Sequence, residues 1–296
     1  MTTPTQLPPC YRCGKQPCEC GATLYCGDCI ELMDDMPRDS VDLVFGSPPY
    51  EDARTYEIDF QLKEQEWVDW MVKVVRASLR VSRGLVAFVV EGRTRQFQYS
   101  ATPSLLEADL HRAGICLRKP LVFGRHGIPG GSPDFPRSDW ERVIACTNGG
   151  RLPWVDLKVM GHPCKYPTGG AMSYRTQDGR RINERKHLNG SAAKGSKKRR
   201  GRPEITKPGD VLWLKVGKGH MGNDLAHENE APFPEDLAEF FVRTFCPPGG
   251  IVLDPFSGSG TTVDVARQHG RRGIGIDLRE SQIELAANRL RQECLF

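Results

Sequence analysis

The chain has 296 residues, of which 39% are hydrophobic, so it can bury the core of one large α/β domain or of one domain with an inserted module. Its net charge of +4 is modest, and no run of about 18 uncharged apolar residues predicts a membrane span. The opening MTTPTQLPP lacks the basic region and the apolar run of a secretory signal, and we expect a cytoplasmic protein.

Short strands and helices alternate over residues 22–147, after a Cys-rich opening at 1–21 that shows no apolar periodicity. In chain order the patterns predict a strand at Thr23–Tyr25, a helix at Ile30–Met36, a strand at Val41–Phe45, a helix within 62–82, a strand at Leu85–Val90, a helix at Leu105–Arg112 and strands at Leu117–Phe123 and Arg142–Thr147. The uninterrupted apolar run Val41–Phe45 is typical of a strand buried on both faces, and it stops at a rigid turn, Gly46–Tyr50.

Residues 148–226 interrupt this alternation, because they are rich in Gly, Lys and Arg and predict only one clear strand, Val211–Val216. Since so irregular a stretch inside a compact domain is usually functional or disordered, we predict an inserted module. The alternation returns with a helix at Asp236–Phe245, a strand at Ile251–Leu253, a helix at Thr262–Gln268, a strand at Gly273–Ile276 and a last helix around Ile283–Leu290. The whole pattern predicts an α/β fold with a doubly wound, mostly parallel sheet.

A glycine-rich turn, Asp254–Thr262, joins a predicted strand to a predicted helix. Glycine lets a backbone approach a ligand closely, and a helix N-terminus offers N–H groups. The turn departs from a dinucleotide site because Val263 stands where the third glycine would fall, and no lysine follows as in a phosphate-binding loop. Asp254 would repel a pyrophosphate but suits the ammonium group of S-adenosylmethionine, and Asp277 suits its ribose hydroxyls. The alternative is a turn that only packs a strand on a helix.

The turn Ser47-Pro48-Pro49-Tyr50 is the second sharp feature. Its two prolines fix the backbone and remove N–H donors, so that carbonyl oxygens remain to accept hydrogen bonds. Ser47 Oγ and the Pro48 carbonyl could hold the amino group of a target base and favour its pyramidal form. Tyr50 could stack on a base turned out of the duplex. The alternative is a proline turn that merely closes a strand.

Together, Gly46–Tyr50 and Asp254–Thr262 resemble the paired motifs of the amino-group DNA methyltransferases, the N6-adenine/N4-cytosine family. The catalytic motif precedes the cofactor motif, which is the order of the β-type group. Leu24–Cys29, Arg142–Thr147 and Pro232–Phe245 resemble further segments of that group. The resemblance covers roughly residues 22–147 and 227–292.

This resemblance implies a Rossmann-like domain that depends on S-adenosylmethionine. A Cys-rich knuckle or tail at 1–21 would precede the catalytic half at 22–147, an inserted target-recognition region at 148–226 and the cofactor-binding half at 227–296. The catalytic residues would be Ser47, Pro48, Pro49 and Tyr50. The cofactor would be bound by Asp28, Cys29, Phe233, Pro234, Asp254, Phe256, Gly258, Gly260, Thr261 and Asp277. In that set Asp28 would accept a hydrogen bond from the adenine amino group of the cofactor, and Phe233 and Pro234 would close over it.

The implied function is site-specific methylation of an exocyclic amino group, N6 of adenine or N4 of cytosine, in a flipped-out base of double-stranded DNA. A serine at the first motif position is commonest among cytosine-N4 members, but this residue does not identify which of the two bases is methylated. Members need no catalytic cysteine or metal, and we expect a homodimer in the bacterial or phage-infected cytoplasm, associated with the nucleoid. A DNA-binding regulator with a decayed site and an RNA or protein-amide methyltransferase are the alternatives. The intact motifs oppose the first, and the motif order and basic insert oppose the second.

The insert carries a basic run, which predicts contacts to DNA phosphates and a salt-dependent affinity. Its members are Lys194, Lys197, Lys198, Arg199, Arg200 and Arg202. Within it, Arg200-Gly201-Arg202-Pro203 resembles the core of an AT-hook, a segment that lies in a narrow minor groove. The alternative is a solvated, mobile loop.

The chain has eleven cysteines, an odd number, and Cys10, Cys13, Cys18 and Cys20 crowd its opening. In a cytosolic chain this crowding favours a metal, or chance, over disulfides. Four thiolates could bind one structural zinc ion and order about 20 residues that lack a core. Cys10, Cys13, Cys26 and Cys29 form an alternative set, ranked second because Cys26 and Cys29 flank Asp28. A disordered tail with free thiols is the other interpretation.

Overall fold

The computed structural model describes residues 9–15, 20–52, 60–126, 134–165, 173–175, 177–183, 203–217 and 233–292. The chain divides into two compact units: unit 1 comprises Met1–Asp156 and Asp210–Phe296, and unit 2 comprises Leu157–Gly209. Unit 2 is narrower than the insert predicted at 148–226, because the flanking segments belong to unit 1. Within the described ranges, no helix is both long and apolar enough to cross a membrane.

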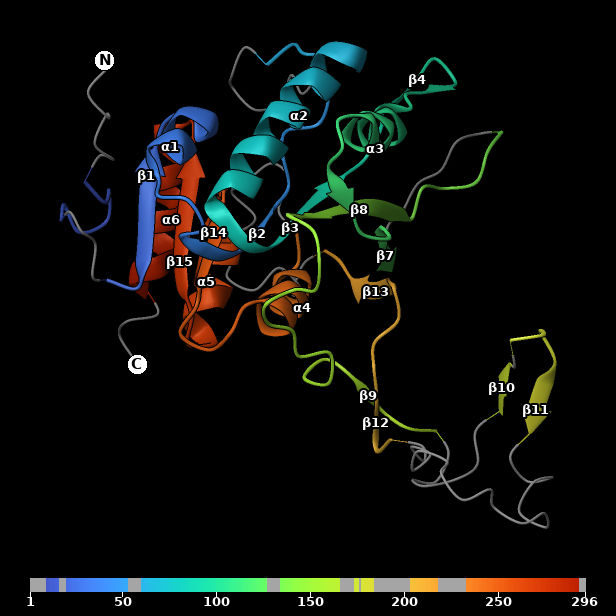
Figure 1. The fold of residues 1–296 in the computed structure, drawn as a ribbon. Coiled ribbons are helices and arrows are strands. Elements are labelled where there is room, and N and C mark those ends of the chain that lie inside the picture. Colours follow the sequence, from blue (N-terminus) through green and yellow to red (C-terminus); the bar gives the residue numbers. More distant parts are fainter. Residues whose placement is uncertain are drawn as a thin grey trace. The chain divides into compact units, whose positions relative to one another are not determined.

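A nine-stranded sheet forms the centre of unit 1 (Figure 1). Across the sheet its strands are β1 (Ala22–Cys26), β15 (Arg272–Asp277), β14 (Ile251–Asp254), β2 (Val41–Gly46), β3 (Ser82–Val90), β8 (Trp140–Thr147), β7 (Leu121–His126) and β13 (Val211–Lys215), and β6 (Cys116–Leu117) pairs with β8. The strands β1, β15, β14, β2 and β3 are parallel to one another. β8 runs antiparallel to β3, β6 and β7, whereas β13 is parallel to β7. The predicted α/β fold with a mostly parallel sheet is confirmed.

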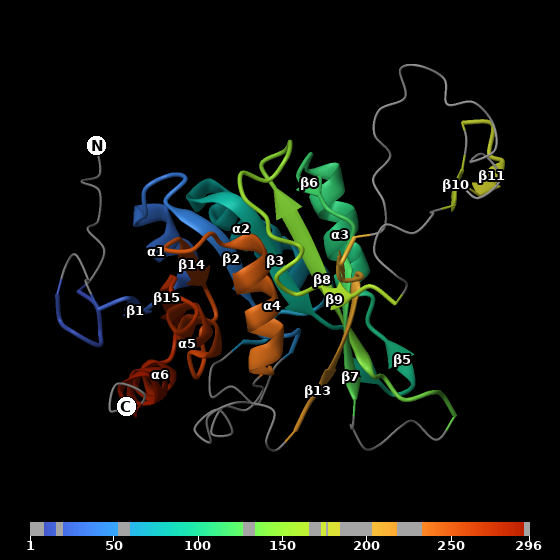
Figure 2. The same cartoon turned by 90° about the horizontal axis from the view of Figure 1, so that it is seen from below.

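Helices cover both faces of this sheet (Figure 2). One group consists of α1 (Cys29–Asp35), α2 (Glu64–Val81) and α3 (Thr102–Arg112), and the other of α4 (Glu235–Phe245), α5 (Thr261–Gln268) and α6 (Glu280–Gln292). Alternation along β1 supplies both cores, because Leu24 packs with residues of α5 and α6 whereas Tyr25 packs with residues of α1 and α2. The apolar side chains, which recur with period 2 in the strands and period 3.6 in the helices, therefore form the core of a doubly wound fold.

Two predicted strands differ in the structure. Leu117–Phe123 was expected as one strand, but it splits into β6 and β7 on either side of Pro120. Proline has no N–H to give to a sheet, so it interrupts the ladder at this point. The strand expected at Val211–Val216 exists as β13, but it belongs to the main sheet beside β7 and not to the insert.

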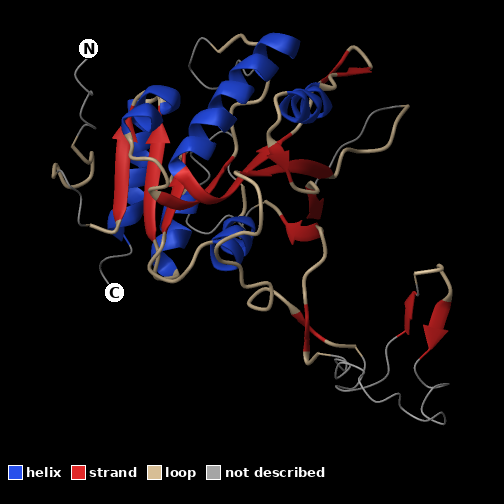
Figure 3. Cartoon of the chain, viewed as in Figure 1, coloured by secondary structure: helices blue, strands red, loops and turns tan. Residues whose placement is uncertain are grey.

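Short antiparallel pairs account for the remaining strands. In unit 2, β9 (His162–Pro163) pairs with β12 (Ile205–Thr206), and β10 (Ser173–Arg175) pairs with β11 (Arg181–Asn183), as Figure 3 shows in red. In unit 1, β4 (Thr94–Arg95) and β5 (Gln98–Tyr99) form a small hairpin. The basic run predicted to bind DNA lies outside the described residues, so its role stays a prediction.

Candidate active site

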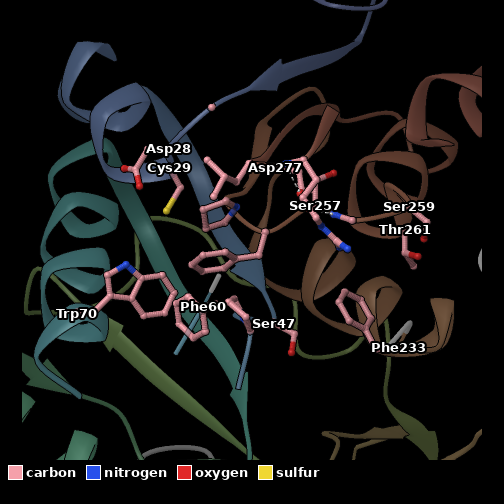
Figure 4. Close-up of a pocket in the computed structure, with 17 residues that line it drawn as sticks. Asp28, Cys29, Ser47, Phe60, Trp70, Phe233, Ser257, Ser259, Thr261 and Asp277 are labelled. Atoms are coloured by element: carbon pink, nitrogen blue, oxygen red, sulfur yellow. Dashed lines mark hydrogen bonds and ion pairs between the residues drawn. The ribbon is translucent and has the colours of Figure 1, made fainter. Parts of the chain in front are cut away.

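A pocket in unit 1 lies where β1, β15, β14 and β2 end (Figure 4). Its lining consists of residues 27–29 after β1, Ser47 and Pro49 after β2, residues 255–259 after β14, residues 277–279 at the end of β15, and Phe60, Trp70, Phe233 and Thr261. In open α/β sheets, ligand sites form outside the carboxyl ends of the strands. The parallel order of these four strands thus brings both sequence motifs to one pocket.

The two motifs are in contact at Gly46, the last residue of β2. A Cβ atom at Gly46 would lie 2.2 Å from Oδ1 of Asp254, the last residue of β14. Since no side chain fits there, glycine allows the catalytic turn and the glycine-rich turn to leave neighbouring strands side by side. Positions that are about two hundred residues apart in the chain therefore lie against each other next to the pocket, although neither of them lines it.

Ser47 and Pro49 line the pocket, and their hydrogen bonds define which atoms remain for a ligand. The Ser47 hydroxyl donates to the Val89 carbonyl at 3.3 Å. Its proton is thereby directed away, and its oxygen lone pairs remain to accept hydrogen bonds. The Pro49 carbonyl accepts from Trp67 Nε1 at 2.9 Å, which fixes the turn against α2. Pro48 is buried and, like Tyr50, is not among the residues that line the pocket.

Tyr50 is held by a charged pair on β7 and β8. Its hydroxyl donates to Glu141 Oε2 at 2.9 Å, and Glu141 Oε1 pairs with Arg125 Nη1 at 2.7 Å. Burial raises the pKa of Glu141, although Arg125 and the tyrosine hydroxyl oppose this shift. The tyrosine ring is thus fixed by a side chain that sequence reasoning missed, because nothing near Glu141 in the sequence distinguishes it from a surface residue.

The glycine-rich turn uses its two glycines differently. Gly258 has a φ of 48° and lines the pocket, where its N–H donates to Asp277 Oδ2 at 2.9 Å. Gly260, with a φ of 82°, is the N-cap of α5, and a Cβ there would lie 3.0 Å from the Cβ of Ala286 on α6. Gly260 was predicted to bind the cofactor, but the structure places it in helix packing, outside the pocket lining.

Asp254 is buried and does not line the pocket, although it was predicted to contact the cofactor. Its side chain accepts from the Phe256 N–H at 3.0 Å, and only 1% of the residue is exposed. Burial raises the pKa of Asp254 to about 7, and the nearby carboxylate of Asp277 adds to this shift. A cation that came close to this carboxyl would favour its charged form.

Three more predicted cofactor residues line the pocket at the ends of β1 and β15: Asp28, Cys29 and Asp277. Asp28 Oδ1 caps α1 by accepting from Ile30 N at 2.8 Å and Glu31 N at 3.1 Å, which leaves Oδ2 as the oxygen for a ligand donor. Burial raises the pKa of Cys29, so this thiol is neutral near pH 7. Asp277 Oδ1 accepts from the Arg279 N–H at 3.0 Å.

An aromatic wall closes another side of the pocket. Phe60 and Trp70 have ring centroids 5.0 Å apart, and those of Trp70 and Phe256 are 5.6 Å apart. Phe256 was predicted to bind the cofactor, whereas Phe60 and Trp70 were not assigned to the site. The predicted Phe233 lines the pocket against Phe45, with centroids 5.6 Å apart.

Pro234 and Thr261 complete the predicted cofactor set. Pro234 is buried as the N-cap of α4 and does not line the pocket, so the structure gives it a role in starting that helix. Thr261 lines the pocket and also accepts from Arg289 Nη1 at 2.9 Å. Nearby, the buried Ser257 Oγ finds no hydrogen-bond partner among the described residues, although it too belongs to the lining. Such a buried hydroxyl is available to a ligand.

A sequence model of one protein family, described as DNA methylase (N6_N4_Mtase), matches residues 41–288, a span that includes both turns of the pocket. The chain belongs to this family. The predicted assignment to amino-group DNA methyltransferases, which act on adenine N6 or cytosine N4, is confirmed. Nothing in the comparisons favours an inactive regulator or a methyltransferase of RNA or protein.

Individual relatives agree with this assignment. The type II methyltransferase M.ScaI of Streptomyces caespitosus is 28% identical over 91% of this chain and 81% of its own length. The structure of the cytosine-N4-specific PvuII DNA methyltransferase has a TM-score of 0.65 at 19% identity, over 90% of this chain and 85% of that one. TTHA0409 of Thermus thermophilus, provisionally described as a DNA modification methylase and solved with S-adenosyl-L-methionine, has a TM-score of 0.57 at 22% identity, over 92% and 95%. These two structures share the fold.

Proposed function

We propose that the chain transfers a methyl group from S-adenosylmethionine to the amino group of an adenine or a cytosine turned out of double-stranded DNA. One observation carries the proposal: Ser47 of the catalytic turn and Ser257 and Asp277 of the cofactor half line the same pocket. A base bound at Ser47 would lie beside a cofactor bound at Ser257 and Asp277. The cofactor found in the Thermus thermophilus relative is consistent with this choice.

The residues of the pocket fit S-adenosylmethionine. Asp28 Oδ2 and Asp277 offer carboxylate oxygens for its adenine amino group and its ribose hydroxyls, and Ser257 Oγ is a buried hydroxyl without a partner in the described part of the chain. Phe233 and the aromatic wall would exclude water around these groups. When bound, the cofactor supplies an electrophilic methyl group on its sulfonium.

The catalytic turn would act by positioning the target amino group. Because the Ser47 proton is directed to the Val89 carbonyl, the Ser47 oxygen is an acceptor for an amino N–H. The Pro48 carbonyl would accept the second N–H, which requires the turn to open when the base binds because Pro48 is buried outside the pocket lining, while Trp67 fixes the neighbouring Pro49 carbonyl. Two acceptors draw the nitrogen lone pair out of conjugation and toward the methyl carbon. The amino nitrogen would take the methyl group as the sulfonium becomes a neutral thioether, and it would then lose one proton to solvent.

Tyr50 would stack on the flipped base, as enzymes that act on extruded bases require. Its hydrogen bond to Glu141 fixes the ring before DNA arrives, so that less side-chain entropy is lost on binding. Glu141 is in this account a positioning residue. The insert would contact DNA through its basic run, and the predicted homodimer remains a proposal that sedimentation of the purified protein would test.

Methyl transfer from labelled cofactor to DNA tests this function. We expect label in DNA, and hydrolysis to nucleosides should yield N6-methyladenine or N4-methylcytosine, which also identifies the base. Ser47→Ala should greatly reduce transfer, whereas Ser104→Ala, on the exposed outer face of α3, should not. Label that enters RNA or protein but not DNA would overturn the proposed substrate, and full activity of Ser47→Ala would overturn the proposed role of the turn.

A further inference from the structure

We propose that Cys10, Cys13 and Cys20 bind one zinc ion that fastens the N-terminal segment to the edge of the sheet. Their Sγ atoms lie within 4.8 Å of one another, and no other group of three or more His, Cys, Asp or Glu side chains in the described ranges converges in this way. Zinc with four ligands and Zn–S bonds of about 2.3 Å separates its thiolate sulfurs by about 3.8 Å. The three thiols are therefore close to the spacing of ligands.

The backbone between the first two cysteines forms a closed turn. The Gly14 N–H donates to the Cys10 carbonyl at 2.7 Å, and the Cys10 N–H donates to the Lys15 carbonyl at 3.2 Å. Gly14 has a φ of 66°, a conformation that a residue with a side chain rarely adopts, so the glycine after Cys13 permits the turn. This local geometry puts the sulfur atoms of Cys10 and Cys13 on the same side.

The turn is attached to the sheet, which contributes the third cysteine. The Tyr11 N–H donates to the Leu24 carbonyl of β1 at 2.8 Å, and the Tyr11 hydroxyl donates to Glu284 on α6 at 3.1 Å. Cys20 lies two residues before β1, and the intervening Gly21 carbonyl accepts from Gly273 N of β15 at 2.9 Å. One ligand thus comes from the fixed end of a strand and two come from the segment that must be held.

Burial alone would hold this segment weakly. Of the described residues that precede β1, which are 9–15 and 20–21, only Cys10 is buried, at 1% exposure. Ordering each residue costs backbone entropy, so one small buried side chain cannot offset the ordering of the whole turn. A metal that links three cysteines could offset this cost, as zinc does in small domains that fold around it.

The position of the cluster implies a structural ion with no part in methyl transfer. Cys20 precedes the amino end of β1, whereas the pocket lies beyond its carboxyl end, and a five-residue strand spans about 16 Å. Cys26 and Cys29, the alternative ligands, lie at the pocket end, where Cys26 Sγ donates to the Leu278 carbonyl at 3.7 Å. Cys18, the remaining predicted ligand, lies outside the described residues, and the experiment below tests it by substitution.

Metal analysis of the full-length protein, purified under reducing conditions without added zinc, tests the site. We expect about one zinc per chain. Cys13→Ser and Cys20→Ser, at half-buried positions, should lose most of the metal after dialysis against a weak chelator, whereas Cys116→Ser, at an exposed cysteine of β6, should keep it. Cobalt added to the reduced, metal-free protein should give thiolate charge-transfer absorption that weakens in the same two variants. If Cys18→Ser behaves like them, it supplies the fourth ligand.

Three results would overturn the proposal. The first is a wild-type protein that contains no zinc and gives no thiolate absorption with cobalt. The second is metal content in Cys13→Ser and Cys20→Ser equal to that of Cys116→Ser. The third is a disulfide between two of the three cysteines in the reduced preparation, found by mass spectrometry. Circular dichroism of each variant excludes loss of the whole fold, and no readout depends on methyl transfer.

Discussion

Replacing Asp254 by asparagine should make the cofactor-free chain more stable at alkaline pH. The carboxyl is 1% exposed, and burial raises its pKa from 3.8 to about 7. An acid whose pKa is higher in the folded state favours folding fully below its unfolded pKa, and this advantage is lost as the pH rises through the folded pKa. Asparagine has nearly the same shape, carries no charge and can still accept from the Phe256 N–H.

The size of the effect follows from the difference between the two pKa values, 3.8 and about 7. At 1.36 kcal/mol per pKa unit, ionisation of Asp254 costs the folded state about 4 kcal/mol above pH 7. At pH 5 only the pKa interval between 3.8 and 5 contributes, and the cost of ionisation is about 1–2 kcal/mol. The variant should therefore gain stability over wild type at both pH values, and more than twice as much at pH 8 as at pH 5.

Urea denaturation of wild type and Asp254→Asn at pH 5, 7 and 8, without cofactor, measures these differences. Asp264→Asn is the matched control, because Asp264 is also buried but pairs with Arg289 at 3.2 Å and Arg267 at 3.0 Å. Loss of that carboxylate leaves the buried Arg289 undercompensated, so this variant should lose about 3–5 kcal/mol. A gain in Asp254→Asn that is the same at pH 5 and pH 8, or a loss at pH 8, would refute the reasoning.

Three further predictions concern the site and the DNA. Glu141→Ala should lower kcat by up to about a hundredfold by releasing Tyr50, with KM for the cofactor unchanged and Glu141→Gln largely restoring the rate in steady-state kinetics. Gly46→Ala should lower the free energy of unfolding by about 1–3 kcal/mol in urea titrations, because its Cβ would overlap the Asp254 carboxyl. Arg200→Ala combined with Arg202→Ala should weaken DNA binding and reduce the slope of log K against log salt by about 2, while calorimetry shows unchanged cofactor affinity.

Each of these expectations has an outcome that opposes it. Equal kcat in Glu141→Ala and wild type would mean that Tyr50 is positioned without Glu141. A free energy of unfolding equal to that of wild type in Gly46→Ala would mean that a Cβ atom at this position does not clash with the Asp254 carboxyl. DNA affinity that is unchanged in the double arginine variant would exclude the basic run from the DNA contact.

Local patterns predicted the helices and strands of unit 1 well, since each reflects a period set by its own side chains. The apolar residues on both sides of Pro120 favour one strand, but the missing N–H of this proline divides it into β6 and β7. β13 could not be assigned to the sheet in advance, because a short apolar strand gives no sign of its partner. Its pairing with β7 depends on contacts between segments about ninety residues apart.

The candidate site was only partly predictable for a similar reason. Ser47, Asp28, Asp277 and Gly258 belong to turns at strand ends, where sequence motif and position in the fold coincide. Trp70 lies on a helix whose apolar residues do not reveal which of them faces the pocket. Glu141 accepts from Tyr50 from its place on β8, which is separated from β2 by β3. Asp254 belongs to the predicted motif, but its burial outside the pocket lining involves a contact with Gly46 that is distant in the sequence.

The neighbouring positions of β2 and β14 have a consequence for how such a protein can diversify. The machinery for transfer is assembled by two adjacent strands, whatever length of chain runs between them, and the entropy of closing a loop rises only slowly with its length. Unit 2 is inserted within that intervening chain. Segments there can be exchanged, lengthened or replaced without moving either turn, so the DNA contact proposed for the insert can change while the proposed chemistry stays the same.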